Sequence, residues 1–215
     1  MVLRSLLSLC LCLLASTALG EVPGVHLADK SARVDFLDSD EKEFFTSQAV
    51  DLSGRLFVGC REALFVYEPT ADGSFGPRQE LYRFPKDSWL YDLEVYGDDL
   101  FVLTNTALYR VRDAVTHRRD LKPEKLLWGV PLGHFHQGLH GMEFGPTGDL
   151  FLSMGDPQPH LHWDRSRPDH LWHWVFYVGP ENTPFKYVGV GAIFRYGIED
   201  HSLSIHASGL RNSCG

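Results

Sequence analysis

Two histidines and an Arg-Asn pair are the residues of this chain best suited to chemistry. His136 and His140 precede the segment GPTGDLFLSMGD (145–156), and Arg211 and Asn212 lie in the run GLRN. A neutral imidazole accepts a proton efficiently near pH 7, because its intrinsic pKa is close to that pH. A guanidinium presents a planar fork of donors that binds a carboxylate through two hydrogen bonds. Together these residues predict one half of a cofactor pocket.

Each of these residues also has a purely structural interpretation. The two histidines can be loop residues bonded to backbone carbonyls, and the Arg-Asn pair can form a tight turn with the arginine buried against a neighbouring sheet. Asp156 follows Gly155 at the end of a predicted strand, where it either orients His140 or a substrate hydroxyl, or simply caps a loop. The residues alone leave both interpretations open.

The segment between Asp156 and Val190 is rich in histidine, tryptophan and proline, and it is too long for a plain hairpin turn. Its indole rings belong to Trp163, Trp172 and Trp174, and they offer flat apolar surfaces for a sugar ring or a planar cofactor. The alternative is a loop packed on itself. The sequence contains no HExxH motif and no CxxC pair. We therefore expect no metal site formed by this chain.

The elements that must position these residues are short alternating strands, which occur in three clusters with the same internal order. Leu56, Leu100 and Leu150 lie in the second strand of each cluster and recur about 45 to 50 residues apart, the size of a four-stranded propeller blade. Turn signals separate the first strand from the second: Ser53-Gly54, Gly97-Asp98-Asp99 and Thr147-Gly148. A β-sandwich would not repeat this order, so we predict an all-β propeller.

The repeat places three blades at about 44–83, 89–130 and 138–210. Three blades cannot close a ring, because propellers close with at least four and an open set leaves sheet edges unprotected. We therefore expect this chain to be a truncated, N-terminal part of a larger propeller.

The first twenty residues have the pattern of a cleaved signal peptide. Arg4 precedes the apolar run LLSLCLCLL, and Ala18-Leu19-Gly20 supplies the small residues that a signal peptidase prefers. A retained anchor is the rival interpretation, but the run is too short to span a bilayer comfortably. We expect residues 21–215 to be exported to the periplasm or the cell exterior, with no membrane span after cleavage.

Charge, cysteine count and motifs restrict the classes of ligand and partner that this chain can bind. The formal net charge of −8 at pH 7 disfavours nucleic acid and anionic membranes, and it favours neutral or small substrates. Only Cys60 and Cys214 lie outside the signal segment, too few for a disulfide-built scaffold. They either pair with each other, remain buried thiols, or pair with residues beyond Gly215. No CxxCH haem motif, GxSxG elbow or P-loop occurs.

The runs HGMEFGPTGDLFLSMGD, GAIFRYG and ASGLRN are similar to the soluble quinoprotein glucose/sorbosone dehydrogenase superfamily. The resemblance is strongest over about residues 134–215. It is closest to an exported group of membrane-bound dehydrogenase-like proteins, in which helical repeats and a c-type cytochrome follow the propeller. The resemblance implies a six-bladed β-propeller that binds pyrroloquinoline quinone and oxidises a sugar or an alcohol by hydride transfer.

The resemblance also implies roles for individual residues. His140, or His136 at the position used by the glucose-oxidising branch, takes the hydroxyl proton, and Arg211 and Asn212 hold the cofactor together with Asp156. Ser213 departs from the proline usual in the family after GLRN, and further basic contacts and calcium ligands belong to blades absent from this chain.

We therefore expect this chain to be inactive alone, with a cytochrome c domain or another acceptor taking the electrons in the whole protein. The alternative function is a non-catalytic extracytoplasmic propeller that binds carbohydrate or a protein partner.

Overall fold

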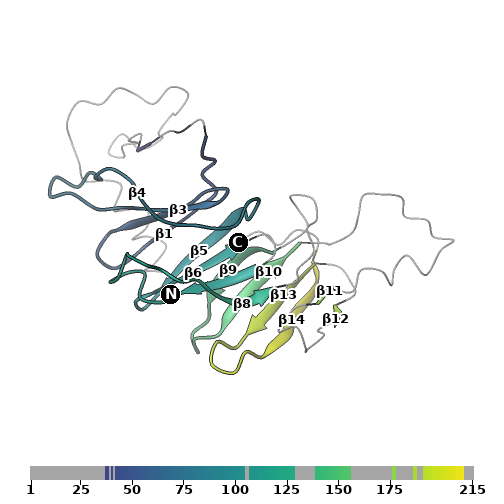
Figure 1. Ribbon diagram of the computed structural model, residues 1–215. Coiled ribbons are helices and arrows are strands. Elements are labelled where there is room, and N and C mark those ends of the chain that lie inside the picture. The colour runs from purple at the N-terminus through teal and green to yellow at the C-terminus, as the bar shows by residue number, and fades with distance from the viewer. Residues whose placement is uncertain are drawn as a thin grey trace, which may run out of the picture.

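The computed structural model describes residues 37–38, 40, 42–104, 107–128, 139–155, 176–177, 186–187 and 191–210. Within these ranges every regular element is a β-strand, and three four-stranded antiparallel sheets lie one beside the next (Figure 1). The described residues include no helix long and apolar enough to cross a membrane. The predicted all-β propeller fold, with three four-stranded blades, is confirmed.

Each blade is a meander in which spatial order follows chain order. The first blade contains β1 (Ser47–Val50), β2 (Leu56–Gly59), β3 (Ala63–Tyr67) and β4 (Gln79–Arg83). The second contains β5 (Leu90–Tyr96), β6 (Asp99–Thr104), β7 (Ala107–Val111) and β8 (Glu124–Trp128). The third contains β9 (Leu139–Phe144), β10 (Leu150–Met154), β13 (Gly191–Tyr196) and β14 (Leu203–Leu210).

The long insertion lies between the second and third strands of the third blade. A separate two-stranded sheet, β11 (Phe176–Tyr177) with β12 (Lys186–Tyr187), belongs to this connection. Because the sheet is antiparallel, β10 ends and β13 begins at the end of the sheet where β9 begins. The insertion therefore leaves and re-enters the blade at the same end as His140.

A turn that contains a glycine with positive φ connects the first two strands of each blade. In the second blade Tyr96 pairs directly with Asp99, and Gly97 between them has a φ of 63°. The first and third blades use longer turns, in which Gly54 and Gly148 hold equivalent places with φ of 80° and 84°. These left-handed conformations favour glycine, which explains why the turn signals in the sequence contain it.

The second strand of the middle blade shows how neighbouring blades share a core. Leu100 and Val102 pack against the first blade, while Phe101 and Leu103 pack against the third, so β6 is buried on both faces. The Leu-Phe pair recurs at the equivalent positions Leu56-Phe57 and Leu150-Phe151. Full burial of such a side chain contributes about 1.5–3 kcal/mol. Four of these side chains are fully buried between blades and hold them together: Phe57, Leu100, Phe101 and Leu150.

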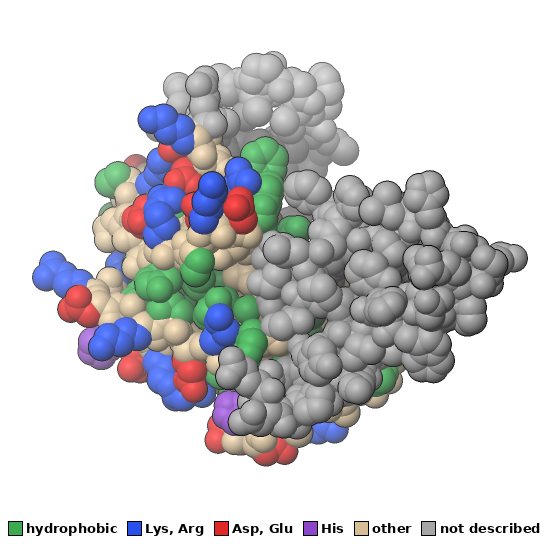
Figure 2. All heavy atoms as spheres, turned by 45° about the vertical axis from the view of Figure 1, so that its right-hand side comes forward, with side chains coloured by type: hydrophobic (Ala, Val, Ile, Leu, Met, Phe, Trp, Pro, Cys, Tyr) green, Lys and Arg blue, Asp and Glu red, His purple; other side chains and the backbone are tan. Residues whose placement is uncertain are grey.

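Two blades repeat a cross-strand ion pair at the turn end of the sheet. Arg110 lies opposite Phe101 and its Nε donates to Asp99 at 2.5 Å, while Arg195 lies opposite Phe151 and its Nη2 donates to Asp149 at 2.6 Å. Figure 2 shows positive and negative side chains side by side on the face in view. Partly exposed pairs of this kind contribute little stability each, so the apolar contacts dominate.

Candidate functional site

Tyr91 and His140 occupy the same place in neighbouring blades, near the start of the innermost strand. In β9, Leu139 and Gly141 face the adjacent residues Met154 and Ser153, which makes His140 the extra residue of a β-bulge. In β5, the same shift lies between Leu90 and Asp92, which makes Tyr91 the extra residue. A bulge re-aims the side chain it carries and is common beside functional sites.

The two bulge residues contact each other across the blade boundary. The ring centroids of Tyr91 and His140 are 5.7 Å apart, with an angle of 44° between the planes. Both side chains lie in half-buried residues. Burial raises the pKa of the Tyr91 phenol, so it stays neutral near pH 7. The pair therefore brings a possible proton acceptor beside a neutral hydroxyl on the inner edge of the sheets.

Asp92 connects the innermost strands of the second and third blades. Its Oδ2 atom accepts the Met142 N–H at 2.7 Å, and its Oδ1 atom accepts the Leu93 N–H at 2.9 Å. Burial raises the pKa of the Asp92 carboxyl, the two backbone hydrogen bonds oppose this, and the charge of Glu143 adds to the rise. A carboxyl group is thus held at the inner edge, between the strands that carry the bulge pair.

The first blade has a related contact one boundary earlier. Ser47 Oγ donates to the Leu90 carbonyl at 2.8 Å, so β1 is tied to β5 as β5 is tied to β9. Gly59 of β2 lies close to both residues, since a Cβ on it would lie 2.3 Å from Ser47 Oγ and 3.0 Å from Leu90 Cβ. Ser47 and Asp92 therefore hold equivalent positions that link successive innermost strands.

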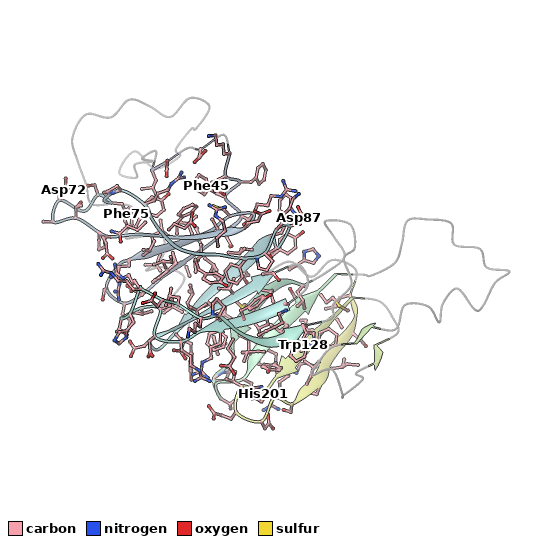
Figure 3. All side chains as sticks on the ribbon, in the orientation of Figure 1. Phe45, Asp72, Phe75, Asp87, Trp128 and His201 are labelled. Carbon is pink, nitrogen blue, oxygen red and sulfur yellow. The ribbon has the colours of Figure 1, made fainter. Side chains whose placement is uncertain are left out.

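The loop before β5 adds an aromatic and charged group at the same end of the sheets. The Trp89 ring lies 6.1 Å from that of Phe44 in an edge-on arrangement, and Arg61 lies over it at 5.0 Å. Arg61 also pairs with Asp87, and both Asp87 and Trp89 have positive φ, 64° and 32°. Such backbone strain in non-glycine residues concentrates at functional sites. Figure 3 shows Asp87 and Trp128 at one end of the sheets, with Asp72 and His201 toward the other.

Of the residues predicted from sequence to form the site, the structure places His140. The others lie outside the described residues and stay predictions: His136, Asp156, Trp163, Trp172, Trp174, Arg211 and Asn212. Within the described ranges, no group of three or more His, Cys, Asp or Glu side chains is arranged to hold a metal ion.

Sequence reasoning missed Tyr91 and Asp92. A signal for both was available in the internal repeat, because LYDLEV of the second blade aligns with LHGMEF of the third. This alignment matches Tyr91 with His140 and Asp92 with Gly141. The bulges and the bond from Asp92 to Met142 could not be read from it, since they depend on how the strands pair.

No protein-family model matches the chain, and no curated protein matches it. Similar solved structures include selenomethionine-substituted virginiamycin B lyase from Staphylococcus aureus, with 12% identity, a TM-score of 0.46 and coverage of 80% of this chain and 44% of that one. A luciferin-regenerating enzyme has 12% identity and a TM-score of 0.48, covering 78% and 46%.

An extracellular domain of a hybrid two-component system from B. thetaiotaomicron has 12% identity and a TM-score of 0.44, covering 78% of this chain and 17% of that one. The chain spans less than half the length of these three structures. Such distant likenesses say nothing of its ligand or reaction. The fold and the inner-edge residues define a β-propeller with a His-Tyr pair where two blades meet.

Proposed function

We propose that this chain is the N-terminal half of an exported propeller dehydrogenase that oxidises a sugar or an alcohol with pyrroloquinoline quinone. The observation that carries the proposal is the place of His140. It is the bulge residue at the start of an innermost strand, in contact with Tyr91 of the next blade. Ligands of propellers and barrels bind where several strands end together, and the His140 ring, whose Nε2 atom is buried, lies at such a place between two blades.

In the proposed reaction the substrate hydroxyl loses its proton to the His140 imidazole. The carbon that carries the hydroxyl loses a hydride, so the alcohol becomes a carbonyl and is oxidised by two electrons. When bound, the quinone supplies the acceptor for that hydride. The neutral Tyr91 hydroxyl is available to hold the substrate oxygen while the proton leaves.

The described inner edge fits a hydroxyl substrate better than it fits the carboxylates of the cofactor. Its described polar groups are the phenol of Tyr91, whose ring contacts that of His140, and the carboxyl group of Asp92, which accepts the Met142 N–H. A quinone that carries carboxylates needs preorganised cations. In this proposal those contacts come from Arg211 and Asn212, with further ones from other blades.

The proposal is tested by calorimetric titration of pyrroloquinoline quinone, with calcium, into the 215-residue chain, after circular dichroism has verified that it is folded. We expect saturable binding that weakens at least tenfold in Arg211→Ala. The matched control is Arg112→Ala, which removes an exposed arginine paired with Glu124 near the turn between β7 and β8 and should bind as the unmodified chain does. Binding that is unchanged in Arg211→Ala, or an equal loss in both variants, overturns the cofactor assignment and favours a non-catalytic propeller.

A further inference from the structure

The innermost strand of a propeller blade has one edge that no strand of its own blade covers, and its backbone groups need partners there. For β9, the Met142 N–H finds its partner in another blade, the Asp92 carboxylate at 2.7 Å. The second oxygen of that carboxylate accepts the Leu93 N–H of its own strand at 2.9 Å. Both oxygens are therefore engaged, one on each strand.

Ser47 makes the corresponding link between β1 and β5 with a neutral hydroxyl and a single bond to the Leu90 carbonyl. Asp92 uses a half-buried carboxyl group instead. Two hydroxyl groups, those of Thr46 and Ser47, therefore donate to one carbonyl at the first boundary, whereas a single carboxyl group binds one N–H on each strand at the boundary where the two bulge residues meet.

Asp92 and its hydrogen-bond partner are each close in sequence to one of the two rings. It directly follows Tyr91, and its partner Met142 comes two residues after His140, about 6–7 Å along the strand. The bulge weakens the regular pairing of β9 with β10 at His140. The hydrogen bond from the Met142 N–H to Asp92, two residues beyond His140, fixes the distance between the two strands that carry the rings.

We propose that Asp92 is a positioning residue, which fixes the β9 bulge and thereby the place of the His140 ring against Tyr91. The inference concerns the geometry of His140 and needs no quinone. Its catalytic consequence rests on the proposed function.

The test follows the ring signal of His140 by NMR in the 215-residue chain without cofactor, assigned by its loss in His140→Gln. Asp92→Ala should move or broaden this signal by more than its linewidth. Asp92→Asn should restore it, because the amide oxygen still accepts the Met142 N–H. Ser47→Ala removes one of the two hydroxyl groups, those of Thr46 and Ser47, that donate to the Leu90 carbonyl one boundary earlier, so it should lower the melting temperature and leave the His140 signal in place.

An unmoved signal in a destabilised Asp92→Ala chain overturns the proposal, because Asp92 would then be only a structural link. An equal movement in Ser47→Ala also overturns it, because general loosening of the blades would be the cause. Should Asp92→Ala not fold, Asp92→Ser takes its place, since it carries the residue found at this position in the first blade. A failed quinone titration leaves the NMR result standing, so the two proposals fail separately.

Discussion

Replacing Asp51 by alanine should destabilise the chain more than removing an exposed ion pair. Asp51 Oδ1 accepts the N–H groups of Ser53 and Arg55 at 2.8 and 3.0 Å, and its Oδ2 accepts Arg55 Nε at 2.5 Å. The Arg55 guanidinium in turn donates to the Val115 carbonyl of the second blade at 2.5 Å. One carboxylate therefore holds both the first turn of blade one and an arginine that reaches across the blade boundary.

The expected loss in the free energy of unfolding follows from the small solvent exposure of this ion pair. The side chains of Arg55 and Asp51 are 14% and 2% exposed. Removing one member of a buried pair costs about 3–5 kcal/mol, because the remaining charge has no counterion. The partial exposure of Arg55 favours the lower end, about 3 kcal/mol. At about 2–4 °C per kcal/mol for a chain of this length, the melting temperature should fall by about 6–12 °C.

The assay is thermal and urea unfolding monitored by circular dichroism, with Glu124→Ala as the matched control. Glu124 also pairs with an arginine, Arg112, but their side chains are 42% and 57% exposed. Such pairs contribute about 0–1 kcal/mol, so the control should barely change the midpoint. Equal losses in Asp51→Ala and Glu124→Ala would refute the reasoning, since burial would then not decide the cost.

Two smaller predictions concern titration. Burial raises the pKa of the Cys60 thiol to about 12, so iodoacetamide should leave it unmodified at pH 8 until the chain unfolds; rapid labelling of the folded chain, seen by mass spectrometry, would contradict this. The Thr70 hydroxyl, more than that of Ser74, lowers the pKa of Asp72 from 3.8 to about 2. The stability from this group is therefore present above pH 4 and lost as the pH falls toward 2. Thr70→Val should raise the pKa in an NMR titration, and an unchanged value counts against the hydrogen bond.

The blade architecture was predictable because packing and turns repeat in the sequence. Leu100 and its equivalents mark the strand that is buried between blades, and glycines such as Gly54 and Gly148 mark the positive-φ turns before it. These signals are local, since each depends on residues within one hairpin. Three occurrences of the same signal were enough to predict four-stranded blades.

Only part of the candidate site was predictable, for a physical reason. His140 is recognisable by residue type, whereas the role of Asp92 depends on a contact with Met142, fifty residues away. Whether Tyr91 lies in a regular strand or a bulge depends on its pairing with β6, which no local pattern encodes. Long-range register is thus the information that the single sequence lacked.

The same repeat also explains why chemistry is expected at the inner edge and not elsewhere in the blade. One core position holds phenylalanine in all three blades: Phe57, Phe101 and Phe151. The first two are buried against the next blade, where close packing favours one side-chain shape. The inner-edge position of Ser47 holds an aspartate in the second blade and a glycine in the third, since each faces a strand edge and not a packed core. A repeated backbone therefore presents different functional groups at one place, and the boundary between β5 and β9 is where this variation brings an imidazole and a phenol into contact, with a carboxyl group that joins the two strands.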